Sequence, residues 1–207
     1  NNQPVFSSDN MFVSYEKEVK SLLLVGENKL EVKFTSPVNQ NRDRVNNYPY
    51  KLPSGSETTA LKVGSFTRKA AYHFGWDWGP RFVTMGIWKP VYLKFYNEVK
   101  INHILTDTKE INEDYAVQEF NIEIESALHA DDYSLVIRDS LFSIKLREGI
   151  NTISASVQID HPKLWWTHDH GNPYLYTENI TLNKSSQNID NELIKYGIRQ
   201  VKLINKT

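Results

Sequence analysis

The residues with the clearest chemical character lie in the segment Gly75-Trp76-Asp77-Trp78-Gly79-Pro80, where one carboxylate stands between two indoles. The flanking glycines and the proline indicate a tight, restricted turn rather than the interior of a strand. Asp77 could accept hydrogen bonds from two adjacent sugar hydroxyls while an indole covers the C–H face of the sugar. The residues alone leave a second interpretation open, in which a buried Asp77 caps a turn beneath two core tryptophans.

Three polar residues near this segment could support Asp77. His73 could orient the carboxylate through a hydrogen bond, or it could be a core histidine bonded to the backbone. Arg68 and Lys69 could supply a counter-ion for Asp77, although a solvated pair of surface charges is the default interpretation.

The motif His168-Asp169-His170 could place two imidazoles on one face of a strand as ligands of a metal ion. No third ligand is apparent, and Gly171 follows directly, so the motif is predicted to be a solvated turn and no metal site or cofactor is predicted. The pair Trp165-Trp166 and the isolated Trp88 are predicted to be core residues rather than platforms for a sugar.

The composition of the chain excludes several classes of partner and site. With 24 basic and 25 acidic residues in 207, the formal net charge is −1, which argues against a nucleic acid or an anionic membrane surface as partner. No apolar run approaches the ~18 residues of a membrane span. The absence of Cys excludes disulfides, thiolate zinc sites and thiol nucleophiles.

Alternating apolar and polar residues predict strands along most of the chain. In the first half, this pattern predicts strands at residues 30–34 and 91–96, separated by a polar, irregular segment at 39–65 that is long enough to be functional. No stretch shows a helical period. Later strands are predicted at residues 120–124, 133–137, 142–146, 153–159, 174–182 and 193–203, with turns at 130–132, 148–149, 171–173 and 183–191.

This pattern predicts an all-β protein of two domains. About seven strands in roughly 110 residues is the count of an immunoglobulin-like β-sandwich, which is predicted for residues 98–207. Residues 1–97 are predicted to form a separate β domain, with the boundary near Asn97.

Four parts of the sequence resemble a β-mannosidase of glycoside hydrolase family 2. The parts similar to its jelly-roll (galactose-binding-like) domain are Asp9-Asn10-Met11-Phe12, residues 23–34 and Ser36-Pro37, and the part similar to its Trp-Asp-Trp segment is residues 68–80 with Gly86-Ile87-Trp88-Lys89-Pro90-Val91. The late strands of its immunoglobulin-like domain are similar to Pro162-Lys163-Leu164-Trp165-Trp166 with Gly171-Asn172-Pro173-Tyr174-Leu175-Tyr176. The element that leads into its catalytic barrel is similar to Tyr196-Gly197-Ile198-Arg199.

The resemblance implies a substrate and a role for the Trp-Asp-Trp segment. In this family the segment reaches the mouth of the barrel and contacts the terminal mannose, so Trp76, Asp77 and Trp78 are the implied substrate-binding residues. The implied partners are β-mannosides or mannose-terminated oligosaccharides. A periplasmic, secreted or lysosomal location would suit the family.

The resemblance also implies that the catalytic residues lie outside the chain. Retaining glycosidases use two carboxylates about 5 Å apart, and in this family both are glutamates of the barrel. The pairs Asn97-Glu98, Asn112-Glu113 and Asn191-Glu192 lack the surroundings of the catalytic motif. We therefore expect a non-catalytic fragment with a partial jelly roll, whose exposed strand edges favour self-association.

Two alternatives stay open. One is another family 2 activity, such as a β-galactosidase or β-glucuronidase, against which the Trp76-Asp77-Trp78 segment argues only by resemblance. The other is a complete, non-enzymatic module for carbohydrate binding or adhesion.

Overall fold

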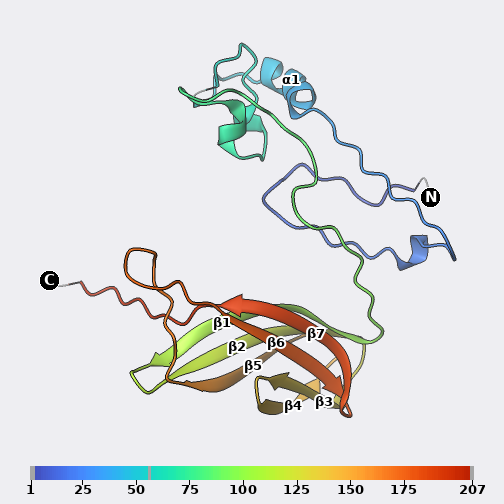
Figure 1. Cartoon of the computed structure of the whole chain (residues 1–207). Coiled ribbons are helices and arrows are strands. Elements are labelled where there is room, and N and C mark those ends of the chain that lie inside the picture. Colours follow the sequence, from blue (N-terminus) through green and yellow to red (C-terminus); the bar gives the residue numbers. More distant parts are fainter. Residues whose placement is uncertain (1–2, 56, 206–207) are drawn as a thin grey trace. The chain divides into compact units, whose positions relative to one another are not determined.

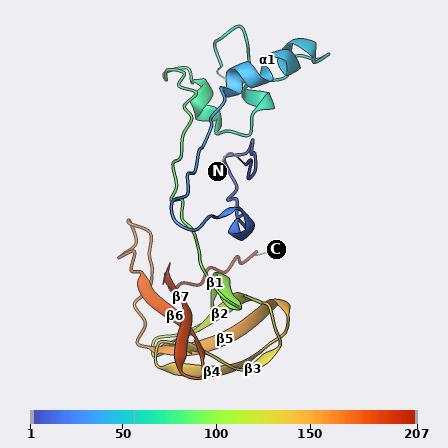
Figure 2. The ribbon, with the colours of Figure 1, turned by 90° about the vertical axis from the view of Figure 1, so that its right-hand side faces the viewer.

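The computed structural model describes residues 3–55 and 57–205 of the chain. The chain forms two units, Asn1–Tyr92 (unit 1) and Leu93–Thr207 (unit 2), and Figures 1 and 2 show their secondary structure from two directions. Within the described ranges, no helix has both the length and the apolar character needed to cross a membrane.

Unit 2 is a sandwich of two antiparallel sheets (Figure 1). One sheet has the order β1-β2-β5 and the other the order β4-β3-β6-β7. The strands are β1 (Val99–Ile111), β2 (Tyr115–Ser126), β3 (Ala130–Ile137), β4 (Ser140–Leu146), β5 (Gly149–Asp160), β6 (Tyr176–Lys184) and β7 (Gln187–Tyr196). The all-β class predicted from the sequence is therefore confirmed.

The core of unit 2 lies between its two sheets. Every second side chain of β2 is buried, as expected for a strand with one face on a core. Phe120 of β2 is fully buried, and its ring meets the ring of Tyr196 from β7 edge-on, with centroids 5.4 Å apart. The aliphatic part of the core comes from both sheets and includes Ile122, Leu135, Ile180 and Leu182.

Alternation located most of these strands, but not all of their ends. β1 was not among the predicted strands, and the strand predicted to reach Leu203 ends at Tyr196. The turn predicted at residues 183–191 is only Ser185-Ser186, because both serines adopt left-handed φ angles of 47° and 72°. Such angles are unusual for residues other than glycine, so two serines do not indicate so short a connection.

Unit 1 contains short helices and irregular chain. Its elements are η1 (Lys20–Leu22), α1 (Pro37–Asn47), η2 (Gly64–Phe66) and η3 (Ala71–Phe74). Among the described residues of unit 1, the buried apolar side chains are Val63 and Phe74, and Glu57 is buried as well.

Helix α1 corrects the prediction of an irregular segment after Asn39. Its first turn is capped, since the side chain of Ser36 accepts a hydrogen bond from the backbone N–H of Asn39 and Pro37 occupies the first turn. Between the caps the helix is almost entirely polar and has no buried residue. It therefore lacks the apolar period on which the prediction relied, and only its caps could have revealed it.

The strands predicted at residues 30–34 and 91–96 are also corrected by the structure. Among the described residues, neither segment forms part of a sheet. The alternating apolar side chains are exposed instead, with Leu30 at 70% and Phe95 at 78% of their full accessibility. A strand requires a neighbour to pair its backbone groups, and these segments have no ladder partner here. Trp88, predicted to be a core residue, is 65% exposed.

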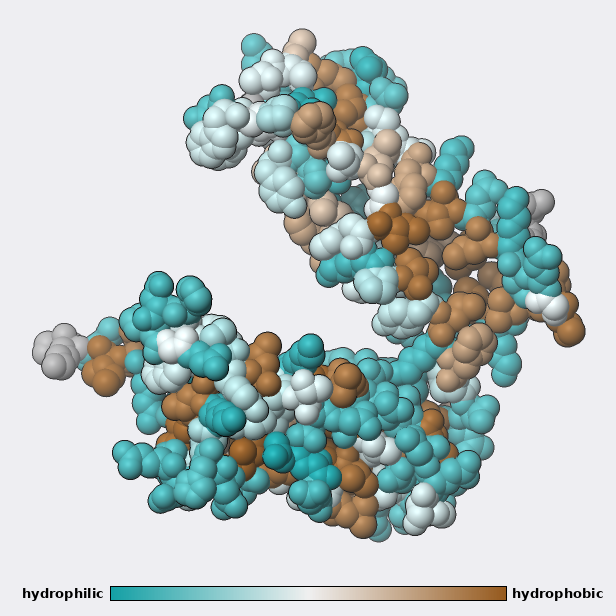
Figure 3. Space-filling view, in the orientation of Figure 1, coloured by the Kyte–Doolittle hydropathy of each residue, from teal (hydrophilic) through white to brown (hydrophobic). Residues whose placement is uncertain are grey.

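We expect this apolar surface to make residues 1–97 either weakly protected or self-associating. Apolar side chains gather on the part of unit 1 visible in Figure 3, and large exposed apolar patches favour association. Hydrogen exchange should therefore be faster in residues 1–97 than in the strands of unit 2, or sedimentation should show dimers or larger species. A strictly monomeric chain with uniform protection would contradict this prediction.

Candidate functional site

The Trp-Asp-Trp segment forms a closed four-residue turn in unit 1. Its ends are joined by two backbone hydrogen bonds, in which the N–H of Trp76 donates to the carbonyl of Gly79 (3.2 Å) and the N–H of Gly79 donates to the carbonyl of Trp76 (3.3 Å). Gly75 precedes the turn with a φ of 104°, an angle that a residue with a Cβ rarely adopts. Local sequence therefore favours a tight turn at this position.

The side chains of the turn point into solvent. Trp76 is 47% exposed, Trp78 is 82% exposed, and their rings meet edge-on with centroids 5.5 Å apart. Asp77 is exposed, and its Oδ1 accepts the N–H of Trp78 at 3.1 Å. A carboxylate offers about four acceptor positions, so this single local bond leaves most of its capacity for a ligand. The chemistry available is the acceptance of hydroxyl protons beside two indole surfaces.

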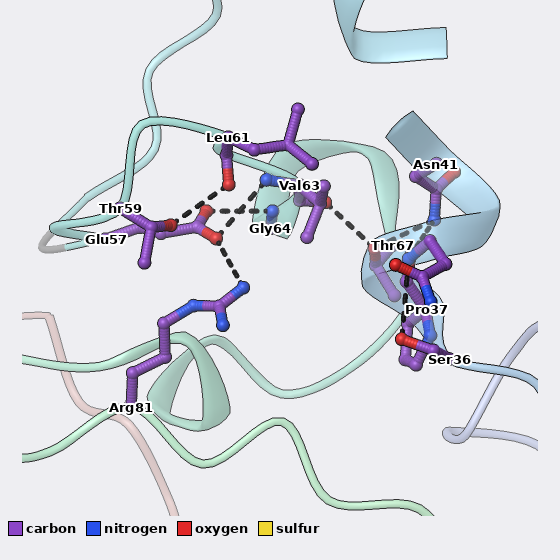
Figure 4. A network of polar contacts seen from close by, with 11 residues as sticks. Ser36, Pro37, Asn41, Glu57, Thr59, Leu61, Val63, Gly64, Thr67 and Arg81 are labelled. Carbon is purple, nitrogen blue, oxygen red and sulfur yellow. Dashed lines mark hydrogen bonds and ion pairs between the residues drawn. The ribbon is translucent and has the colours of Figure 1, made fainter. Parts of the chain in front are cut away.

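An ion pair joins the buried carboxylate of Glu57 to the partly exposed guanidinium of Arg81 (Figure 4). The side chain of Glu57 has no solvent exposure, and its Oε1 is 3.2 Å from a terminal nitrogen of the Arg81 guanidinium. Glu57 also accepts the backbone N–H groups of Val63 (3.3 Å) and Gly64 (3.0 Å). Arg81 follows the turn directly after Gly79-Pro80, so the ion pair joins the turn to the 57–64 loop.

A second set of hydrogen bonds connects the same loop to helix α1. The hydroxyl of Thr67 donates to the carbonyl of Val63 (2.8 Å), and the side-chain amide of Asn41 donates to the Thr67 hydroxyl oxygen (3.2 Å). Figure 4 shows this branch on the side of Val63 opposite to Arg81. The 57–67 loop therefore has one polar anchor toward the turn and another toward α1.

His73, one of the residues considered as a support for Asp77, contacts other groups instead. The Nδ1 of His73 lies 3.2 Å from the carbonyl of Phe82 and 3.3 Å from the hydroxyl of Thr84, which corresponds to the backbone-bonded alternative. Over the described part of unit 1, no ion pair joins Asp77 to Arg68 or Lys69. Burial lowers the pKa of the Lys69 ammonium.

Unit 2 holds the histidine motif and the tandem tryptophans. His168-Asp169-His170 forms an exposed turn, and the described residues contain no group of three or more side chains that could hold a metal ion. Trp165 is half-buried, with the Arg199 guanidinium 4.7 Å from its ring centroid, whereas Trp166 is 50% exposed. The prediction of two core tryptophans therefore holds only partly for Trp165 and is wrong for Trp166.

The three Asn-Glu pairs all belong to unit 2, and two of their glutamates form ion pairs. Glu98 pairs with Lys184 at 3.4 Å, and Glu192 pairs with Lys94 at 2.9 Å. Glu113 is exposed in the turn between β1 and β2. Glu98 and Glu192 are therefore each engaged in an ion pair with a lysine.

A shallow depression of about 400 Å³ also lies on unit 2, lined by Arg138, Asp139, Tyr174, Tyr176, Thr177 and Glu178. Burial raises the pKa of the Glu178 carboxyl, although Arg138 at 3.3 Å opposes the shift. The ring of Tyr176 stacks on Tyr196 (5.5 Å between centroids), and the Arg138 guanidinium lies 5.9 Å from it. Tyr176 is therefore already in contact with protein groups and is not a free platform for a sugar.

Two residues of the candidate site were not identified from the sequence. Arg81 could have been flagged because it directly follows Gly79-Pro80. Glu57 gave no comparable signal, since it lies 24 residues before its partner in a polar segment without periodicity. Only the fold brings the two side chains together.

Two family models match the chain. The one described as "Glycosyl hydrolase 2 galactose-binding domain-like" matches residues 1–89, and the one described as "Glycosyl hydrolases family 2" matches residues 98–199. The two matches together extend over most of the sequence.

The chain is also similar to named proteins. Beta-mannosidase B of Emericella nidulans is 30% identical over 214 residues, covering 99% of this chain and 25% of the relative. The beta-mannosidase of Capra hircus is 32% identical over 200 residues, covering 87% of this chain and 22% of the relative. A crystal structure of a beta-D-mannosidase from Dictyoglomus thermophilum matches 96% of this chain with a TM-score of 0.80 and 35% identity.

These relatives are much longer proteins. The chain spans about a quarter of the curated E. nidulans protein and of the D. thermophilum structure. The family predicted from four parts of the sequence is nevertheless confirmed over nearly the whole chain: the chain belongs to glycoside hydrolase family 2.

Proposed function

We propose that the chain belongs to a larger retaining exo-β-mannosidase that removes terminal β-mannose residues, and that it contributes a substrate-contacting turn rather than a catalytic carboxylate. Its substrates would be β-mannosides or mannose-terminated oligosaccharides, and its intramolecular partner would be a catalytic barrel. Residues 1–97 would be the partial jelly-roll domain, and residues 98–207 the immunoglobulin-like domain.

The observation that carries this proposal is the exposed Trp76–Gly79 turn. A sugar presents hydroxyls at its edge and C–H groups on its face, so its recognition needs a hydrogen-bond acceptor beside an aromatic surface. Asp77 and the two indoles offer both, and Trp76 and Trp78 are 47% and 82% exposed. A core role for these tryptophans would require burial.

The absence of catalytic carboxylates from the chain is also part of the proposal. Retention requires a nucleophile and an acid/base about 5 Å apart. The ion-paired Glu98 and Glu192 are occupied by Lys184 and Lys94, so they are poor candidates for a pair that must exchange protons with a substrate. The two glutamates would therefore come from the barrel.

The proposal is tested on the full-length protein. Chromogenic β-mannoside, β-galactoside and β-glucuronide should be compared, and the anomeric configuration of the first product should be followed by NMR. Preferential cleavage of the mannoside with retention would support the proposal. Preference for either of the other two sugars would assign the protein to another family 2 activity.

We expect the 207-residue chain alone to hydrolyse no chromogenic β-mannoside, because both catalytic glutamates are proposed to lie in the barrel. The measurement is release of the chromophore over hours at high protein concentration, against a buffer blank. Turnover that persists through repurification would refute the non-catalytic assignment.

The exposed indoles also favour a second candidate, a sugar-binding module that acts without a barrel. This function predicts saturable binding of mannose or mannobiose to the 207-residue chain. Titration followed through the indole N–H signals of Trp76 and Trp78 measures it directly. Saturation at millimolar sugar would favour the module, whereas no shift would favour a turn that needs the rest of the enzyme.

A further inference from the structure

We propose that Glu57 and Arg81 are a positioning pair that holds the Trp76–Gly79 turn in the geometry required to contact a sugar. This inference rests on the function proposed above for the turn. It assigns a role to two residues that do not themselves touch the substrate.

The side chain of Glu57 is held in place by its surroundings. Its carboxylate is fully buried and accepts three donors, which are the backbone N–H groups of Val63 and Gly64 and the guanidinium of Arg81. The Oε2 of Glu57 accepts the N–H of Gly64, and its Oε1 accepts both the N–H of Val63 and the Arg81 guanidinium (Figure 4). Its position is determined by rigid groups, as required for a fixed anchor.

Arg81 is connected to both ends of the turn. A Cβ placed on Gly75 would lie 3.5 Å from the Arg81 Cβ and 3.7 Å from its Cα, so the chain at Arg81 packs against the residue directly before the turn. At the other end, Arg81 is joined to Gly79 through Pro80, whose ring restricts the backbone. A displacement of Arg81 therefore moves both ends.

Glu57 is the main polar restraint on Arg81. The guanidinium lies 6.0 Å from the centroid of the buried Phe74 ring, and its Nε is buried without a hydrogen-bond partner. Among the described residues, Glu57 is the carboxylate that pairs with it. Loss of this contact would leave the guanidinium without its charged partner.

A positioning role for the Glu57–Arg81 pair differs from simple stabilisation. A buried ion pair is weak evidence for stability, because apolar groups of similar volume often serve as well. Sugar recognition, in contrast, requires its groups to be held within about 0.5 Å of the productive geometry. The turn has two backbone hydrogen bonds of its own, at 3.2 and 3.3 Å, and the Glu57–Arg81 pair supplies the additional restraint from outside.

The test is amide hydrogen exchange, followed by NMR, in the 207-residue chain carrying Glu57→Gln. In either orientation a Gln amide places its NH₂ opposite an N–H donor, because both oxygens of Glu57 accept backbone N–H groups. We expect exchange at Trp76 and Gly79 to accelerate at least tenfold relative to exchange at Gln40, whose N–H donates to the Ser36 carbonyl in α1. Arg81→Lys, which keeps the charge but loses the planar fork, should show a smaller change in the same direction.

The matched control is Thr67→Val, which removes the anchor toward α1 from the same loop. In Thr67→Val, exchange should accelerate around Asn41. The acceleration at Trp76 and Gly79, relative to that at Gln40, should stay below twofold. Equal acceleration at the turn and at Gln40 in Glu57→Gln would indicate a structural role only and would overturn the proposal. So would unchanged exchange at the turn in both Glu57→Gln and Arg81→Lys.

This readout contains no sugar, so it distinguishes failure of the positioning role from failure of the proposed function. A turn that is loosened as expected, in a protein whose kinetics do not depend on Asp77, would retain the positioning role and reject the sugar contact. In the full-length protein, Glu57→Gln is expected to lower kcat/KM through the loosened turn at a temperature where the variant remains folded. Wild-type kinetics in Glu57→Gln, beside impaired kinetics in Asp77→Ala, would overturn the proposal.

Discussion

In the full-length protein, Asp77→Ala is expected to lower kcat/KM for a β-mannoside by about tenfold to 150-fold, with almost no change in Tm. A charge-assisted hydrogen bond contributes roughly 1.5–3 kcal/mol, and its loss in the transition state produces a rate decrease of this size. Stability should hardly change because Asp77 is exposed and its described contact is the N–H of the next residue, Trp78. Steady-state kinetics and a thermal melt on the same preparation provide both quantities.

Two variants serve as controls for Asp77. Asp77→Asn retains the size of the side chain and an oxygen that can accept the Trp78 N–H, so it should show a smaller kinetic loss. Asp43→Ala removes an exposed carboxylate from α1 and should leave kinetics unchanged. If Asp77→Ala lowers Tm while kcat/KM per folded molecule stays at the wild-type value, Asp77 is a turn-capping residue and not a substrate contact.

The largest effect on stability is expected from Phe120→Ala in the sandwich of unit 2. Phe120 is fully buried in β2, and its ring lies edge-on to that of Tyr196 at 5.4 Å. Truncating a buried Phe to Ala costs about 3–5 kcal/mol, because transfer energy is lost and a cavity remains. Urea denaturation followed by far-UV circular dichroism should show this decrease in the free energy of unfolding of unit 2.

Leu141→Ala is the matched control for Phe120→Ala. Leu141 lies in β4 of the same unit, but its side chain is 68% exposed. Surface substitutions of this kind usually change stability by less than about 0.5 kcal/mol. A loss below about 1 kcal/mol for Phe120→Ala would mean that the core can collapse around the missing ring, contrary to the close packing expected of protein interiors.

The sandwich shows why some of the fold could be predicted from the sequence. In β2, alternation alone predicted a strand with one buried face, because a strand turns successive side chains to opposite sides. The link between β6 and β7 could not be predicted in this way. The left-handed φ angles of Ser185 and Ser186 become favourable only when the paired strands require a tight connection.

Unit 1 shows how periodicity can fail in both directions. Residues 30–34 alternate in the sequence but form no ladder in the structure, since pairing requires a neighbouring strand that local sequence cannot supply. Helix α1 forms without an apolar period, because capping by Ser36 and the N-terminal Pro37 favours it locally. The resemblance to glycoside hydrolase family 2 rests on whole segments of sequence, so neither of these two wrong predictions of secondary structure affected it.

The candidate site could likewise be predicted only in part from the sequence. The sequence by itself determined the Trp76-Asp77-Trp78 chemistry and the tight turn, because Gly75 allows the required φ of 104° and residues 76–79 close the turn with their own backbone bonds. Only the tertiary structure decided which side chains hold that turn in place. Glu57 and Arg81 are 24 residues apart in the sequence, and the folded loop at Val63 and Gly64 places the buried carboxylate beside the guanidinium.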